Sequence, residues 1–278
     1  LGDVYKRQGS ISGTTLTVGN VTNNTTCTVN YTKQTYTITY NLNGGSVSGN
    51  PTSYDVTSEA ITLKNPSKTG YTFTGWTGSN GSTPQTSVTI PKGSTGNKTY
   101  TANYKANTYT VEYNSNGGSG TTASSSHTYD TAKALTKNGF TRTGYTFLGW
   151  STNKDATTAT YTDSQSVKNL TSTNGGKVTL YAIWKINTYD VNVVVQNGTT
   201  SPSTRTVNYN TNATFTVNPS TGYHYTSVSC TNNQKASMSG TTLTVSNVTN
   251  DATCTVSNTA NTYTAVSYTH LRAHETVL

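Results

Sequence analysis

One phrase of this chain is written twice. The letters TGYTFTGW at residues 69–76 return as TGYTFLGW at residues 143–150, 74 positions further along. Tandem copies of so small a unit predict a series of modules, and such chains hold something at a distance or present a repeated surface. We therefore expect the sequence to define an architecture and a broad role, but no particular ligand.

Each unit opens on a predicted strand that ends in Asn-Gly-Gly. The openings are YTITYNLNGG at residues 36–45 and YTVEYNSNGG at residues 109–118. A period of two puts Tyr36, Ile38 and Tyr40 on one face, and Asn and Gly tolerate the positive φ of a sharp turn. The repeated phrase is also strand-like, and the glycine before its tryptophan is expected to form a bulge or bend. Further strands are predicted near residues 53–56, 100–104, 127–129 and 178–184.

The composition indicates thin modules with aromatic cores. Only 31% of the residues are hydrophobic and 10% are charged, while Thr, Asn, Ser, Gly and Tyr fill the rest, which favours strands and turns. In so small a unit each fully buried ring contributes about 2–3 kcal/mol. Exposed rings could instead stack on sugars, but a ring repeated at a fixed module position is more often core. The predicted core residues are Tyr71, Phe73, Trp76, Tyr104, Tyr145, Phe147, Trp150, Tyr181, Trp184 and Tyr223.

A third unit follows with the same entry but a different middle. It keeps the letters NTY at residues 187–189 and replaces the Gly-Trp phrase with GYHY at residues 222–225. Its closing segment, residues 237–256, recurs as residues 10–29 at an offset of 227, with sixteen of twenty positions identical. We therefore expect that the chain opens inside a truncated copy of this divergent form.

The strand into Asn-Gly-Gly, the TGYTF-x-GW phrase and the closing LYAIW at residues 180–184 together resemble the internalin B-repeat, also called the Listeria-Bacteroides repeat. The resemblance covers roughly residues 35–186 and departs from the pattern at Tyr104, where the repeat usually has Trp. It implies a small β-grasp-like sheet in an exported, surface-displayed bacterial protein, and it does not imply catalysis.

These observations predict an all-β, or β-rich α+β, chain of tandem small β-grasp-like modules in an elongated array, because connections such as residues 105–108 and 185–188 are too short for loose tethers. The predicted divisions are a non-native-looking leader at 1–8, a divergent-repeat remnant at 9–34, B-repeat-like modules at 35–106 and 107–186, a divergent module at 187–262 and a non-native-looking tail at 263–278.

The two ends are set aside because they resemble translated read-through at the ends of environmental gene fragments. In the tail, His270 and His274 stand four residues apart before Glu275. On a helix this spacing would suit zinc, but the order is not that of the zinc-protease motif. We therefore predict no metal site.

The repeat explains why the chain has an odd number of cysteines, three. Cys254 aligns with Cys27, and the residue aligned with Cys230 would fall at position 3, inside the leader. A disulfide between Cys230 and Cys254 would stabilise its module by roughly 3 kcal/mol and would indicate an oxidising compartment. Two unpaired buried thiols are the alternative.

No catalytic constellation stands out in the sequence. Outside the tail only His127 and His224 could serve as a general base, and neither lies in a strand-turn-helix phrase with Ser or Cys. His224 is expected to face solvent, opposite Tyr223 and Tyr225. The carboxylates are isolated, and the Gly-Gly pairs lack the residues of a phosphate loop. We predict that the chain is not an enzyme and uses no cofactor.

The formal charge of +8 comes from basic residues spread along the chain without a run, as expected of a soluble surface rather than a nucleic-acid partner. No stretch approaches eighteen consecutive apolar residues, so we expect no membrane insertion within this fragment. The predicted role is the stalk or spacer of a monomeric bacterial cell-surface or secreted protein, with an adhesin as the expected context. The alternative is a set of modules that bind host protein, glycan or cell-wall polymer by avidity.

Overall fold

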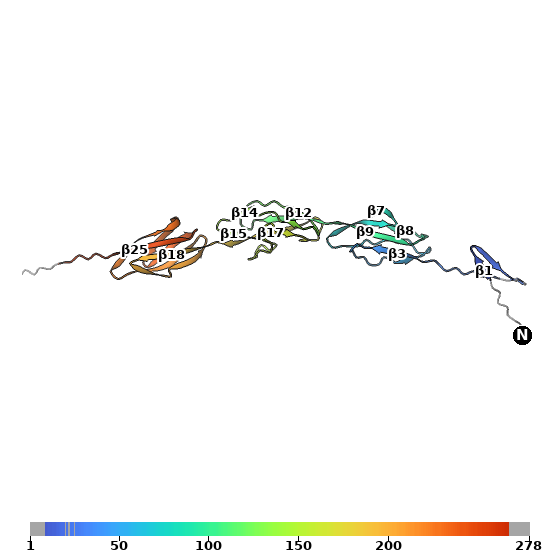
Figure 1. Cartoon of the computed structure of the whole chain (residues 1–278), viewed down its shortest axis with the longest axis horizontal. Helices are drawn as coiled ribbons and strands as arrows, with labels where there is room; N and C mark the ends of the chain where they lie inside the picture. Colours follow the sequence, from blue (N-terminus) through green and yellow to red (C-terminus); the bar gives the residue numbers. More distant parts are fainter. Residues whose placement is uncertain (1–8, 20, 22, 25, 267–278) are drawn as a thin grey trace, which may run out of the picture. The chain divides into compact units, whose positions relative to one another are not determined.

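The computed structural model describes residues 9–19, 21, 23–24, 26–266. The leader at 1–8 and most of the tail, with His270 and His274, lie outside the described residues. Contacts divide the chain into two units, Leu1–Lys105 and Ala106–Leu278. Among the described residues the only helical element is a 3-10 turn, η1, at Thr231–Asn233. The prediction of an all-β chain is confirmed (Figure 1).

The first unit begins with a small hairpin of β1 (Gly9–Ser12) and β2 (Thr15–Val18). Its register places Ser12 opposite Thr15. In the third module the corresponding strands place Ser239 opposite Thr242, which is the same pairing 227 residues later. The hairpin therefore has the structure expected of a copy of that segment.

The first module follows in the same unit. Its main sheet has the order β4-β3-β9-β6-β7, with β3 and β9 parallel, and β5 and β8 form a separate pair. The strands are β3 (Tyr36–Asn41), β4 (Ser53–Tyr54), β5 (Ile61–Thr62), β6 (Tyr71–Gly78), β7 (Gly81–Gln85), β8 (Thr89–Ile90) and β9 (Lys98–Ala106).

The second module opens the second unit. Its main sheet has the order β12-β10-β17-β15, with β10 and β17 parallel, and short pairs β11–β14 and β13–β16 lie outside it. The strands are β10 (Thr108–Asn114), β11 (Ser119–Gly120), β12 (Ser125–Thr128), β13 (Lys133–Ala134), β14 (Phe140–Thr141), β15 (Tyr145–Ser151), β16 (Ser166–Val167) and β17 (Gly176–Ile186).

The third module has two sheets of four strands, in the orders β20-β18-β25-β22 and β19-β21-β24-β23. In the first of these sheets, β18 and β25 lie side by side and parallel (Figure 1). The strands are β18 (Thr188–Gln196), β19 (Gly198–Ser201), β20 (Thr204–Asn208), β21 (Thr211–Pro219), β22 (Tyr223–Cys230), β23 (Lys235–Ser239), β24 (Thr242–Val248) and β25 (Ala252–Ala260).

All three modules share one strand order. In each main sheet, the first and last strands of the module are parallel neighbours. The next strand of that sheet (β4, β12 or β20) lies beside the first, and a later one (β6, β15 or β22) lies beside the last, with β7 added at this edge in the first module. This is the order of a β-grasp sheet. In place of a covering helix, the first two modules have short strand pairs and the third has a second four-stranded sheet. The shared order explains why a divergent sequence keeps the same entry and closing strands.

The predicted core residues differ in how deeply they lie. Trp76 and Trp150 are 0% exposed, and their rings meet those of Phe73 and Phe147 edge-on. Tyr104 and Trp184 are partly buried and pack on the same clusters. The other three tyrosines predicted as core in the first and second modules, Tyr71, Tyr145 and Tyr181, are half-buried and lie outside the core clusters.

The prediction for Tyr223 is wrong, because this side chain is 36% exposed. The core of the third module lies between its two sheets and is built from aliphatic residues and Phe215. Tyr225, two residues further along β22, packs against that core instead. Tyr181 lies outside the core for a different reason, strand alternation, since its neighbours Leu180 and Ala182 are fully buried on the other face.

Candidate functional site

The most elaborate local structure in each B-repeat-like module surrounds the Asn-Gly-Gly turn. We call it the turn lock. In the second module it comprises Asn116, Gly117, Gly118, Arg142 and Trp184. Asn116 adopts a φ of 47°, and its Nδ2 donates to the Ala182 carbonyl of the closing strand at 3.0 Å. The turn is therefore bonded directly to the last strand of its own module.

An aromatic side chain from the closing strand completes the lock. The Trp184 indole N–H donates to the Ser115 carbonyl at 2.8 Å, just before the turn. A Cβ on Gly118 would lie 2.9 Å from the Trp184 ring, so the second glycine makes room for it. The ring thus fills the space inside the turn and satisfies a backbone acceptor there.

A cation covers the outside of the turn. The Arg142 guanidinium lies 3.9 Å from the centroid of the Tyr145 ring, and its Nη1 donates to the Asn116 carbonyl at 3.4 Å. This member was missed from the sequence. The signal that could have found it is a basic residue two positions before the glycine of TGYTF in both copies.

The first module repeats the lock with Asn43, Gly44, Gly45, Lys68 and Tyr104. Asn43 Nδ2 donates to the Ala102 carbonyl at 2.8 Å, and the Tyr104 hydroxyl donates to the Leu42 carbonyl at 3.3 Å. Lys68 Nζ donates to the Asn43 carbonyl at 3.0 Å and lies 4.2 Å from the Tyr71 ring centroid. Burial raises the pKa of Tyr104, so its hydroxyl remains a donor at neutral pH.

The third module keeps the hydrogen bonds of the lock without its ring. Asn197 has a φ of 52° and its Nδ2 donates to the Asn258 carbonyl at 3.1 Å. Asn258, which is buried, donates through its Nδ2 to the Gln196 carbonyl at 2.9 Å, just before the turn. A small amide therefore replaces Trp184 where the second sheet, rather than an aromatic cluster, supplies the core.

We predict that the closing aromatic tolerates exchange between Trp and Tyr better than loss of its donor. Trp184→Tyr keeps a hydroxyl in the place that Tyr104 occupies in the first module. Trp184→Phe removes the indole hydrogen bond to the Ser115 carbonyl, which keeps its 3.0 Å bond from the Gly118 N–H, so the expected cost is that of one hydrogen bond, about 0.5–1.5 kcal/mol. Urea unfolding, monitored by hydrogen exchange of backbone amides in residues 107–186, should show a smaller loss of unfolding free energy for Trp184→Tyr than for Trp184→Phe. Equal losses would show that the ring alone matters.

The two candidate bases lie in different surroundings. His224 is exposed on β22. His127 is 1% exposed on β12, where its ring stacks on Tyr109 with 5.4 Å between centroids. His127 Nε2 lies 2.9 Å from Ser125 Oγ, a pair that the sequence analysis missed. The strand predicted near residues 127–129 began too late to include Ser125, whereas β12 (Ser125–Thr128) puts both side chains on one face.

The Ser125–His127 pair does not form a triad in the described part of the chain. The buried His127 Nδ1 has no hydrogen-bond partner among the described residues, so no carboxylate orients the imidazole as hydrolytic chemistry requires. Within those same residues, no group of three or more His, Cys, Asp or Glu side chains is placed to hold a metal ion.

Burial and the nearby charge of Lys133 lower the pKa of His127 below its usual value of 6.5. The folded second module therefore favours the neutral imidazole, while the unfolded chain takes up a proton at higher pH. We predict that this contribution to stability is present above about pH 6.5. As the pH falls below that value it is lost at up to about 1.4 kcal/mol per pH unit, until the lowered pKa is reached.

The control for this pH dependence is His127→Tyr. The first module has a tyrosine, Tyr54, at the position that corresponds to His127. Urea midpoints of residues 107–186 between pH 5 and 7.5 should fall with acidity more steeply in the natural chain than in the variant. Parallel pH profiles would contradict a role for His127.

The prediction of a disulfide is confirmed. Cys230 and Cys254 are bonded and stand opposite each other on β22 and β25. Cys27 is free and exposed. The bond joins an outer strand to a central strand of the same sheet, so it fixes the edge that carries Tyr223 and His224.

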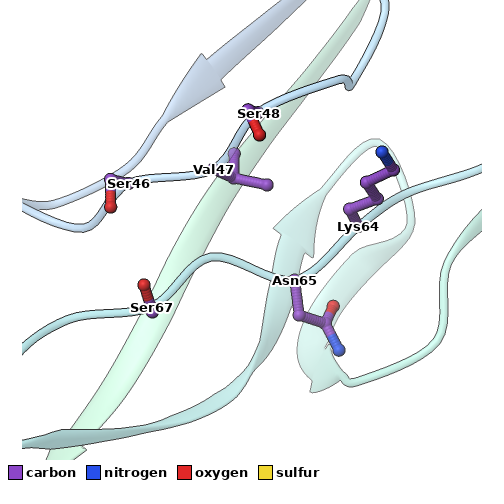
Figure 2. Close-up of a pocket in the computed structure, with 6 residues that line it drawn as sticks. All are labelled: Ser46, Val47, Ser48, Lys64, Asn65 and Ser67. Atoms are coloured by element: carbon purple, nitrogen blue, oxygen red, sulfur yellow. The ribbon is translucent and has the colours of Figure 1, made fainter.

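The first module has a shallow polar hollow of about 500 Å³. Figure 2 shows its two walls, with Ser46, Val47 and Ser48 on one segment and Lys64, Asn65 and Ser67 on the other. Reciprocal backbone hydrogen bonds of 2.9 Å between Ser46 and Ser67 hold the walls together. Hydroxyl, amide and ammonium groups around an open hollow suit polar ligands such as sugars.

In the second unit, one residue connects the second and third modules. Asn187 lies between β17 and β18, and its N–H donates to the Gly144 carbonyl at 2.9 Å. Its side-chain oxygen accepts from Thr146 Oγ1 at 2.7 Å, and its carbonyl accepts from the Tyr209 N–H at 2.8 Å. We call this set of contacts the Asn187 junction. Beside it is a hollow of about 470 Å³ lined by Leu148 and residues 185–189.

The repeated phrase therefore has two uses. Its Gly-Trp end forms the bulge and the core, since the register of β15 against β17 shifts between Phe147 and Gly149. Its Thr-Gly-Tyr-Thr end, residues 143–146, receives the residue that leads into the next module.

Among the described residues, no helix has the length and apolar character needed to cross a membrane. No curated protein sequence matches the chain. The sequence model of the Listeria-Bacteroides repeat domain matches it twice, at residues 36–103 and 109–183, and these two segments together make up just over half of the chain. The segments contain both Asn-Gly-Gly turns and both Gly-Trp phrases, and this chain belongs to the Listeria-Bacteroides repeat domain family.

Proposed function

We propose that this chain is a spacer segment of a bacterial cell-surface or secreted protein, where it holds other parts of that protein at a distance. The observation that carries the proposal is the one-residue junction at Asn187, fixed to both neighbouring modules by hydrogen bonds. A connection fixed in this way limits bending, as a spacer requires.

Two further observations support an exported spacer. Families with this repeat are typical of bacterial surface and secreted proteins, and a disulfide such as Cys230–Cys254 persists in oxidising compartments. The described surface is rich in Thr, Asn and Ser, and the Ser125–His127 pair lacks the partner needed for hydrolysis. We therefore propose a passive, monomeric and extracellular role without catalysis or a cofactor, with an adhesin as its setting.

Solution scattering on residues 35–262 tests the spacer. Modules about 30–35 Å long that follow one another give a rod on the order of 100 Å, with a radius of gyration of about 30 Å. A compact globule of this length would have a radius of gyration of about 17 Å. A value near the lower figure would refute the spacer.

A second candidate is direct binding of host protein, glycan or cell-wall polymer through repeated weak contacts. The polar hollow of the first module favours it, because Lys64 and Asn65 have counterparts in Lys137 and Asn138 of the second. Avidity predicts saturable binding on a glycan or host-protein array that weakens steeply when one module is deleted. The spacer alone predicts no saturable binding by the same fragment.

A further inference from the structure

The Asn187 junction includes one contact that explains why its glycine is needed. Gly144 has a φ of 74°, and a Cβ at this position would overlap the ring of Tyr209. Tyr209 belongs to the third module and follows Asn187 by 22 residues. The second module thus offers a bare glycine, and the third module places an aromatic ring directly on it.

Half of the same arrangement recurs at the far end of the third module. Asn261, the first residue after β25, donates its N–H to the Gly222 carbonyl at 2.7 Å. Its side-chain oxygen lies 2.8 Å from His224 Nδ1. Gly222 has a φ of 81°, close to that of Gly144. Gly222, His224 and Asn261 therefore repeat the geometry of Gly144, Thr146 and Asn187.

The other half of the arrangement is missing there. Apart from its chain neighbours, no atom of the described residues lies within 4 Å of the place where a Cβ of Gly222 would be, so within this part of the chain no ring covers this glycine as Tyr209 covers Gly144. The neighbouring Tyr223 is 36% exposed. Tyr223, which was predicted to be core, is therefore an exposed ring directly beside this uncovered glycine.

The sequence after this surface begins like a module. The letters NTYT at residues 261–264 are those at residues 107–110, where the second module starts. In the second module the entry Asn107 accepts a 2.8 Å hydrogen bond at its carbonyl from Tyr129, 22 residues later. The entry asparagine and its distant tyrosine thus form one end of a module in two independent cases.

We propose that Gly222, Tyr223, His224 and Asn261 form a docking surface for the entry end of a further module of the same kind. An aromatic residue 22 positions after Asn261 in that module lies on Gly222, as Tyr209 lies on Gly144. Asn261–Thr264 then belong to the docked repeat, whereas the predicted divisions placed 261–262 in the third module and 263–264 in the non-native-looking tail. The inference is independent of whether the modules act as spacers or as binding units.

The test is a chain in which residues 9–262 are followed by a second copy of residues 189–262. Hydroxyl-radical footprinting measures the oxidation rate of Tyr223 in the resident third module, compared with the chain without the added copy. We expect a several-fold lower rate, because the ring of the added Tyr209 covers Gly222 and its surroundings. An unchanged rate overturns the proposal.

Two variants of the extended chain separate docking from other effects. Tyr209→Ala in the added copy alone should restore the original oxidation rate of Tyr223. His224→Thr in the resident module should keep the protection, since Thr146 makes the matching hydrogen bond in the Asn187 junction. Mass spectrometry of the disulfide in the added copy shows that the copy has folded. Protection that survives Tyr209→Ala would also overturn the proposal.

Discussion

Replacing Gly149 by alanine is expected to remove about 2–6 kcal/mol from the stability of the second module. Gly149 has a φ of 138°, which is strained for alanine by about 1–3 kcal/mol. A Cβ there would also overlap the Tyr161 carbonyl oxygen and lie 2.8 Å from the Ala159 Cβ, and such overpacking adds about 1–3 kcal/mol. The Tyr161 carbonyl cannot withdraw freely, because it accepts the Trp150 N–H at 2.7 Å.

The measurement is urea unfolding, monitored by hydrogen exchange of backbone amides in residues 107–186. The matched control is Gly175→Ala in the same module, where φ is 71° but a Cβ would meet nothing within 4 Å. The control should lose only the backbone cost of about 1–2 kcal/mol. If the two variants were equally unstable, the close approach of Tyr161 would have no energetic role.

Breaking the Cys230–Cys254 bond is the second large effect that we expect. The two cysteines are 24 residues apart in sequence, and opening a loop of this size costs about 3 kcal/mol in the chain-entropy description. A protein of ordinary stability holds only about 5–15 kcal/mol. In the double variant Cys230→Ala, Cys254→Ala, the third module should therefore unfold at a much lower urea concentration. Hydrogen exchange of backbone amides in residues 187–262 monitors this unfolding.

The first two modules provide the internal control for this experiment. Neither contains a cysteine in its strands, so their midpoints should be the same in the variant and in the natural chain. A reducing agent should reproduce the effect in the natural chain and change nothing in the variant. A third module that melts at the same urea concentration with and without the bond would contradict the prediction.

The strands and turns of the B-repeat-like modules followed from the sequence because each depends on local chemistry. Alternation placed Ile38 inward, and Asn-Gly-Gly supplied the positive φ of Asn43 and Asn116. The bulge at Gly149 was expected for the same reason, since only glycine suits that backbone. Each of these patterns also occurs in both B-repeat-like modules, which supported the predictions.

Features that depend on distant parts of the chain did not follow. Tyr223 has the local surroundings of a core residue, but a second sheet that the repeat pattern did not reveal supplies the core of its module. Arg142 was overlooked because its partners, Tyr145 and the Asn116 carbonyl, come together only in the folded module. The use of Thr146 in the Asn187 junction was hidden because its partner lies 41 residues away.

The parallel pairing of the first and last strands has a mechanical consequence. In the second module β10 begins at one end of the central pair and β17 ends at the other, so tension applied to the two ends pulls these strands past each other lengthwise. Their hydrogen bonds are then strained in shear, all at once, rather than opened one after another like a zip. The same holds for β3 with β9 and β18 with β25, and each module is thereby built to resist stretching.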